Sequence, residues 1–138
     1  MRIYPKKSVF GWKGDNGLGN TLIEQIIQGD KTATCSFKAE YTETELEDVL
    51  GSKGEMVTVV DQTGTARCNI RILDVFETTF GNPDMRLVRG EGDGNDVRAF
   101  QEDHRRAWHE TMQDAELKDD TVLVVELFEL VGVAEEGE

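Results

Sequence analysis

The strongest constraint on the fold is a pair of β-forming runs that are joined by a short turn. The first run, Glu55–Asp61, is apolar and rich in valine, and Gln62-Thr63-Gly64 supplies typical turn residues. The second run, Thr65–Phe76, alternates between apolar and polar residues, as a half-buried antiparallel strand does. We therefore predict a β-hairpin here. The two expected faces of its second strand are Ala66, Cys68, Ile70 and Ile72 on one side, and Arg67, Asn69 and Arg71 on the other.

Apolar residues at helical spacing predict one helix over Leu18–Gln28 and another over Asp96–Met112. Asn16 or Asn20 is a candidate cap for the start of the first helix, and Gly29 suits a left-handed residue after its end. The apolar faces comprise Leu18, Leu22, Ile23, Ile26 and Ile27 in the first helix, and Val97, Phe100, His104, Trp108 and Met112 in the second.

Two shorter segments follow the first helix. Thr32–Phe37 combines strand formers with small polar residues, which predicts a strand. Thr42–Leu50 is strongly acidic and is typical of a short helix, with Thr42 or Thr44 as its cap and Gly51 at its end.

The last expected element is a fully buried closing strand over Thr121–Val131, interrupted by Glu126. The complete order is then helix, strand, helix, hairpin, helix, strand. Because this order does not alternate as βαβ units do, a doubly wound parallel sheet is not expected. We predict a β-rich α+β fold in which a mixed, partly closed sheet carries peripheral helices.

The chain length of 138 residues predicts a single domain, without internal repeats or linkers. No run is apolar and long enough to cross a bilayer, and residues 1–7 lack the apolar stretch of a signal peptide. Cys35 and Cys68 form neither a disulfide framework nor a CxxC metal motif. We therefore expect a cytoplasmic protein with reduced thiols and no membrane partner.

The net charge of −13 repels polyanions, so we expect no general nucleic-acid binding. Part of this charge belongs to an acidic tail over residues 132–138, which follows a core of about residues 10–131. A local excess of arginines either holds a phosphate or short nucleotide, or pairs with neighbouring carboxylates on a solvated face. We favour pairing for at least three of the five. The arginines are Arg86, Arg89, Arg98, Arg105 and Arg106, and the carboxylates are Glu91, Asp93, Glu102 and Asp103.

Two polar segments are candidate binding sites. In Gly29–Thr34, a lysine follows the helix end and precedes two hydroxyl residues, so the segment can form a cationic, hydrogen-bonding rim of a pocket. The alternative is that the lysine only interacts favourably with the helix dipole. Arg89–Gly94 alternates glycine with charged residues, but its spacing fits neither a calcium loop nor a phosphate loop. This second segment either caps the following helix through Asp93 or Asn95, or aims a carboxylate into a cleft.

Histidines and an isolated carboxylate complete the candidates. His104 and His109 are five residues apart, which does not direct both at one metal, so we expect no metal site and no cofactor. His104 is expected to be a hydrogen-bonded core histidine. Glu126, alone in an apolar strand, must pair with a cation, accept hydrogen bonds or face a wet pocket. We favour a structural partner, an arginine or His104, over a catalytic role. Cys35 is expected to be a small buried hydrophobe.

The order and spacing of these pieces resemble the ASCH family, a branch of the PUA-like folds. The similar elements are Phe10-Gly11, the motif Gly29-x-Lys31-Thr32-Ala33-Thr34-x-Ser36, a segment bearing Tyr41, the Gly90-Glu91-Gly92-Asp93 loop, His104, and Glu126 two residues before Phe128. The resemblance covers nearly the whole chain and implies a mixed-sheet pseudo-barrel with peripheral helices.

Some ASCH proteins are amidohydrolases that remove an acyl group from N4 of cytosine nucleosides, and another is a ribonuclease. The resemblance to the amidohydrolase branch implies that Lys31, Thr34 and Glu91 are catalytic. It also suggests a substrate-binding role for Thr32, Ser36, Tyr41, Arg89, Asp93 and His104. The chain departs from that branch at Ser36, where the branch has arginine, and at Arg89, where its loop begins with an acidic residue.

The chemistry sets a geometric condition on this assignment. On a regular strand Lys31 and Thr34 point to opposite faces, so they converge only if Lys31 lies in the turn before the strand or a bulge intervenes. Thr34 as a nucleophile needs a base, and a contact between Lys31 and Glu91 would favour Lys31 as oxyanion stabiliser and Glu91 as proton carrier. The expected partner is a small nucleoside-like substrate or a short RNA, and non-catalytic RNA binding and ribonuclease activity are the alternatives.

Overall fold

The computed structural model describes residues 1–111 and 117–134, and side chains are described outside residues 109–116 and 135–138. The predicted apolar residue Met112, the side chain of His109 and the end of the acidic tail lie outside these residues. The elements are β1 (Lys7–Val9), α1 (Leu18–Gln28), β2 (Ala33–Phe37), a 3-10 helix η1 (Lys38–Glu40), α2 (Glu43–Leu50), β3 (Met56–Val60), β4 (Ala66–Thr79), α3 (Met85–Gly90), α4 (Val97–Thr111) and β5 (Val122–Val133).

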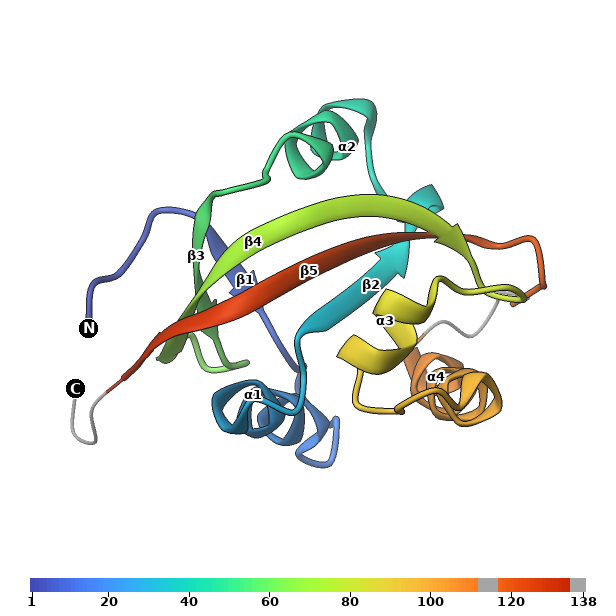
Figure 1. Cartoon of the computed structure of the whole chain (residues 1–138). Helices are drawn as coiled ribbons and strands as arrows, with labels where there is room; N and C mark the ends of the chain where they lie inside the picture. Colours follow the sequence, from blue (N-terminus) through green and yellow to red (C-terminus); the bar gives the residue numbers. More distant parts are fainter. Residues whose placement is uncertain (112–116, 135–138) are drawn as a thin grey trace.

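The five strands form one mixed sheet in the order β1-β3-β4-β5-β2. β1 and β3 are parallel, and every other neighbouring pair is antiparallel. Figure 1 shows β4 and β5 as long, curved neighbours, with α2 above them in this view and α1, α3 and α4 below. The mixed α+β sheet is as predicted. The strand order does not join β1 to β2, so closure into a pseudo-barrel is not confirmed, and within the described residues β2 has a free edge.

The predicted hairpin is present as β3 and β4, although β4 continues to Thr79. One residue of its expected polar face differs from the prediction, because Asn69 is only 4 % exposed. Its amide is satisfied inside the protein: Thr58 Oγ1 donates to Asn69 Oδ1 over 2.7 Å, and Asn69 Nδ2 donates to Arg2 O over 2.7 Å. The N-terminal segment thus covers a face that strand alternation alone leaves in solvent.

The first helix has the predicted bounds but a different start. Its N-cap is Gly17, with no capping side chain, and neither Asn16 nor Asn20 takes that role. Instead the carboxylate of Asp15 accepts from Gly17 N over 2.9 Å and from Gly19 N over 3.0 Å. An anion is favourable at a helix N-terminus, so Asp15 from the preceding loop replaces the expected cap.

Other helix ends follow local signals more closely. Thr42 caps α2, and its capping box with Glu45 contains both reciprocal hydrogen bonds. The start of α4 differs from the prediction, because Asp96 Oδ1 accepts from Ala99 N over 3.0 Å, in place of a cap by Asp93 or Asn95. No helix among the described residues is long and apolar enough to span a membrane.

Three short elements were not predicted. β1 and η1 are three residues long each, and α3 is a six-residue helix that begins after Asp84. All three are too short for a periodic pattern to identify. α3 nevertheless fixes the position of a charged residue, because Leu87 and Val88 anchor the helix in the core and Glu91 directly follows it.

Two apolar clusters form the core, one packed with α1 and the other with α3 and α4. They use alternate side chains of β5, since Phe128 belongs to the first cluster and Leu123 and Val125 belong to the second. The buried members of the first are Phe10, Ile23, Ile26, Val57, Val59, Cys68, Ile70, Ile72 and Phe128. Those of the second are Ala33, Phe37, Phe80, Leu87, Val88, Phe100, Leu123 and Val125. The expectation that the last strand is fully buried is wrong for its second half, where Leu130, Val131 and Val133 are exposed.

Candidate functional site

The turn after α1 determines the position of Lys31. Gly29 has a φ of 86°, the left-handed value predicted for it, and this reverses the chain at the helix end. Asp30 N and Lys31 N both donate to Gln25 O, over 2.9 and 3.1 Å. The strand begins only at Ala33, so Lys31 lies in the turn before it, which meets the geometric condition for convergence with Thr34.

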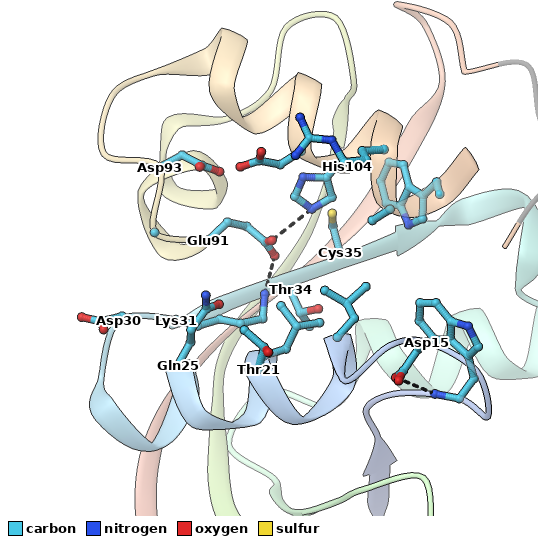
Figure 2. Close-up of a pocket in the computed structure, with 18 of the residues that line it drawn as sticks. Asp15, Thr21, Gln25, Asp30, Lys31, Thr34, Cys35, Glu91, Asp93 and His104 are labelled. Atoms are coloured by element: carbon cyan, nitrogen blue, oxygen red, sulfur yellow. Dashed lines mark hydrogen bonds and ion pairs between the residues drawn. The ribbon is translucent and has the colours of Figure 1, made fainter. Parts of the chain in front are cut away.

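The side chain of Lys31 is almost completely buried and is held by two acceptors. Its Nζ donates to Ala33 O over 2.7 Å and to Glu91 Oε1 over 2.7 Å. Because Phe128 N donates to Thr32 O, the antiparallel alternation directs the backbone groups of Ala33 to the free edge of β2. Lys31 therefore covers this edge. Figure 2 shows the ammonium meeting the Glu91 carboxylate there.

Glu91 reaches this edge because α3 packs tightly on β2. A side chain on Gly90 would place its Cβ 2.4 Å from Ala33 Cβ, so only glycine permits this approach. Gly90 O also accepts from Thr32 N over 2.7 Å, which joins the two backbones. Gly90 is therefore needed for this close packing, and the packing fixes the position of the Glu91 carboxylate relative to β2.

The second oxygen of Glu91 contacts His104 on α4. His104 Nε2 lies 3.0 Å from Glu91 Oε2, and His104 Nδ1 lies 2.9 Å from Phe100 O. Both ring nitrogens therefore face oxygens that accept hydrogen bonds, the Phe100 carbonyl and the Glu91 carboxylate. The ring is tilted against Phe100 and meets Trp108 edge-on, so His104 is the hydrogen-bonded histidine of the apolar face that the sequence predicts.

Electrostatics favour the ionised form of Glu91. Burial by itself would raise the pKa of Glu91, but the charges and hydrogen bonds of Lys31 and His104 outweigh it and lower the pKa below its ordinary value of 4.5. The Glu91 carboxylate is thus held between the Lys31 ammonium and the His104 ring in an otherwise acidic pocket.

This trio lies in a pocket of about 1020 Å³. α1 and the loop before it form one wall, and α4 forms the other, with Trp12 and Trp108 among the lining residues. The described lining is predominantly acidic apart from the trio. Its ionisable residues outside the trio are the carboxylates Asp15, Asp30, Glu40, Asp93 and Asp103, the cation Arg106 and the thiol of Cys35.

Asp93 and Asp103 form an unusual pair at this pocket. Burial, the charge of Asp103 and a hydrogen bond with Asp103 raise the pKa of Asp93 to about 6, and the charge of His104 acts against this. Asp93 therefore keeps its proton at mildly acidic pH, where it is hydrogen-bonded with Asp103. Asp103 was predicted only as an arginine partner, and no local pattern distinguishes it from the other acidic residues of α4.

The structure brings five of the nine predicted site residues to the pocket. Its lining includes Lys31, Thr34, Glu91, Asp93 and His104. The other four do not line it: Thr32 is exposed at the turn, the Ser36 side chain bonds Tyr41, and Arg89 Nε donates to Asn95 Oδ1 over 2.7 Å.

Sequence reasoning gave no site role to several lining residues, among them Trp12, Cys35 and Asp103. Trp12 is 37 % exposed, and a large aromatic residue beside the Phe10-Gly11 motif is the signal that would have found it. Cys35 offers Sγ close to Glu91 and His104, with the three ligand atoms within 4.8 Å of one another.

These three groups are poor ligands for a divalent metal ion as they stand. Burial and the charge of Glu91 raise the pKa of the Cys35 thiol well above 9.0, so the sulfur stays protonated. Lys31 also holds one oxygen of Glu91 with a positive charge.

The arginine cluster has other partners than those expected. Arg86 pairs with Asp84 and Asp74, over 2.9 and 3.5 Å, and its guanidinium lies 4.0 Å from the Phe76 ring centroid. Arg105 lies over the ring of Phe80. None of the predicted carboxylate partners of these arginines takes that role among the described residues, and Glu91 is held by Lys31 and His104 instead.

Glu126 also lacks the expected partner. His104 contacts Glu91 in its place, and among the described residues no arginine pairs with Glu126. Its neighbour across the sheet is Thr34, which it directly opposes in the register of β2 and β5.

Comparison with known proteins places this architecture in a family. A family model described as an ASCH domain matches residues 9–132. The chain belongs to the ASCH domain family. Its ASCH fold is similar to a crystal structure of a protein from Enterococcus faecalis V583, with a TM-score of 0.74 and 24 % identity over 96 % of this chain and 80 % of that one.

A second solved structure, an ASCH domain from Lactobacillus crispatus JV V101, has a TM-score of 0.71 and 23 % identity, over 94 % of this chain and 82 % of that chain. At these identities the likeness shows the ASCH fold alone. No curated protein matches the sequence.

Proposed function

We propose that this ASCH domain protein is an amidohydrolase that removes an acyl group from a small N-acylated substrate, with N4-acylated cytosine nucleosides as the leading class. The observation that carries the proposal is the buried Lys31–Glu91 ion pair at 2.7 Å, in a pocket that Thr34 also lines. The resemblance to the amidohydrolase branch supplies the substrate class.

Lys31 is suited to stabilise an oxyanion. An ammonium has three N–H donors, and Ala33 O and Glu91 Oε1 each take one. The third remains for the carbonyl oxygen of a substrate, and the two fixed acceptors hold the charge in place before the reaction. Such preorganised donors account for a large part of catalysis in many acyl-transfer enzymes.

Thr34 is the candidate nucleophile. It lines the pocket, and no hydrogen bond involves its hydroxyl among the described residues. Attack on an amide carbonyl needs a base that accepts the hydroxyl proton. Glu91 is the carboxylate that the family resemblance suggests for proton transfer.

The charge around the pocket favours a small neutral substrate over RNA. Asp15, Asp30, Glu40 and the Asp93–Asp103 pair surround the Lys31 site. These carboxylates repel a phosphate backbone, whereas they accept hydrogen bonds from the hydroxyl and amino groups of a nucleoside.

The test is incubation of the purified protein with N4-acetylcytidine, with cytidine release followed by chromatography. Wild type should turn over, and Thr34→Ala should lose nearly all activity. Thr32→Ala is the matched control, since Thr32 is exposed outside the pocket. Absence of turnover by wild type across a series of N-acylated nucleosides, or full activity of Thr34→Ala, would rule the proposal out.

Non-catalytic RNA binding and ribonuclease activity are the competing functions. Binding would require the cations of the α3–α4 region, but Arg86 is engaged by two aspartates and Arg89 by Asn95. RNA binding predicts salt-dependent affinity that weakens when Arg86, Arg89 or Arg98 is replaced. Ribonuclease activity predicts metal-independent cleavage that Lys31→Ala abolishes, and the same preparation can be assayed for both.

A further inference from the structure

Thr34 and Glu126 occupy directly opposite positions on β2 and β5. Residues in this relation share one face of the sheet, with Cβ atoms about 4.5–5.5 Å apart. A glutamate side chain at one such position is long enough to reach a threonine hydroxyl at the other. The register therefore brings a carboxylate to the candidate nucleophile from a distant part of the chain.

The shared face is the one that α1 covers. Ala33 and Phe37 pack in the cluster with α3 and α4, so Thr34, between them, points to the other side. Phe128, two residues after Glu126, packs with Ile26 of α1. Glu91 and His104 approach β2 from the α3–α4 side, so Glu126 is the carboxylate on the same face as the Thr34 hydroxyl.

Thr34 lines the pocket, whereas Glu126 lies outside the described lining, at the position opposite Thr34 in the sheet. Among the described residues no hydrogen bond or ion pair involves the Thr34 hydroxyl or the Glu126 carboxylate, and no fully buried side-chain oxygen lacks a partner. Both groups therefore keep some contact with solvent. Glu129, on the same strand, is instead paired with Arg71 over 3.1 Å.

The surroundings shift the pKa values of Glu91 and Glu126 in opposite directions. Lys31 and His104 engage both oxygens of Glu91 and outweigh the effect of its burial, so its pKa is lowered and it is a weak base. Burial raises the pKa of Glu126, and the charge of Lys6 only partly opposes this. The charge of Glu126 in turn contributes to the raised pKa of Tyr41, whose hydroxyl bonds Ser36. A partly buried carboxylate without a cation in contact is the better proton acceptor.

We propose that Glu126 is the general base that accepts the Thr34 proton, an inference that rests on the proposed amide hydrolysis. The Thr34 oxygen bonds to the carbonyl carbon as its proton moves to Glu126, and the carbonyl electron pair becomes an oxyanion facing Lys31. Collapse breaks the C–N bond, and the leaving nitrogen takes the proton from Glu126. Water then attacks the threonyl ester and gives a proton to Glu126. The ester C–O bond breaks, the Thr34 oxygen takes that proton back, and the carboxylic acid is released.

The kinetic test compares Glu126→Gln with the matched variant Glu129→Gln across pH 4–9. Glu126→Gln should lower kcat/KM for N4-acetylcytidine by about 10²-fold or more, and it should abolish the fall in rate at acidic pH that belongs to the base. Glu129→Gln should retain both the rate and the acidic limb. Near-wild-type activity of Glu126→Gln with its acidic limb intact would overturn the assignment.

A second measurement does not depend on turnover. The carboxyl carbon of Glu126 is titrated by NMR in wild type and in Thr34→Val, which removes the hydroxyl but keeps the branched shape. The pKa should lie above the ordinary 4.5 in wild type and rise further in the variant, because a methyl group replaces the polar hydroxyl opposite the carboxylate and stabilises its negative charge less. An unchanged pKa overturns the pairing. A shifted pKa without any turnover supports the pairing and rejects the amidohydrolase.

Discussion

The ammonium of Lys31 lies 2.7 Å from Glu91 Oε1, although 60 positions separate the two residues in the sequence. The contact joins the turn after α1 to the end of α3, where both meet the free edge of β2. Only 3 % of the Lys31 side chain and 8 % of the Glu91 side chain are exposed. Desolvation makes such a pair expensive to form, but removing one partner is costlier because the other charge stays buried.

We expect Lys31→Met to lower the free energy of unfolding by about 3–5 kcal/mol, because Glu91 then keeps only His104. The double variant Lys31→Met/Glu91→Leu should recover much of this loss. Lys6→Met is the control, since it breaks an exposed pair with Glu55 and should cost less than about 1 kcal/mol. Urea unfolding at pH 7 measures all three, and equal losses for Lys31→Met and Lys6→Met would contradict the prediction.

The Asp93–Asp103 pair predicts a pH dependence of stability. The pKa of Asp93 is about 6 in the folded protein against 3.8 ordinarily, so the folded state binds more protons between these values. The free energy of unfolding therefore decreases as the pH rises through this window. Asp103→Asn removes the like charge and should make that decrease smaller.

Urea unfolding at pH 4, 5, 6 and 7 checks this effect in wild type and variant. Glu102→Gln is the matched control, because it removes the same charge from the neighbouring exposed position. If Glu102→Gln flattens the profile as much as Asp103→Asn does, the effect belongs to overall charge and the pair is not its cause.

The close contact of α3 with β2 predicts that Gly90→Ala is destabilising. The added Cβ would lie 2.4 Å from Ala33 Cβ, so α3 must move away from the strand and carry Glu91 with it. We expect a loss of about 1–3 kcal/mol and a fall in amide hydrolysis. Gly132→Ala, where a Cβ meets nothing, should change neither. Thermal unfolding and the cytidine-release assay distinguish the outcomes.

The capping box of α2 predicts a contrast between two neighbouring threonines. Thr42→Ala removes the side chain that accepts from Glu45 N over 3.1 Å and should cost about 1 kcal/mol. Thr44→Ala, inside the helix and without a cap bond, should leave stability unchanged or slightly raise it. Equal losses in chemical denaturation would show that the box contributes nothing.

Local sequence determined the parts of this protein that depend on near neighbours. The period of Leu18–Gln28, the left-handed Gly29 and the Thr42 cap are all properties of segments shorter than a dozen residues, and each was predicted correctly. The same local geometry showed that Lys31 and Thr34 converge only if Lys31 lies in the turn before the strand or a bulge intervenes. Lys31 lies in the turn because the strand begins two residues later.

Tertiary structure decided which distant groups meet. Local rules assigned Asn69 to solvent and a partner such as His104 to Glu126, but the N-terminal segment buries Asn69, and His104 meets Glu91. The alternation of residues along β5 does not indicate that Glu126 lies opposite Thr34, because register depends on how two strands align across the sheet. Strand register is selected by packing and charge interactions between segments that are far apart in the chain. The spacing of residues within one segment carries no information on these interactions.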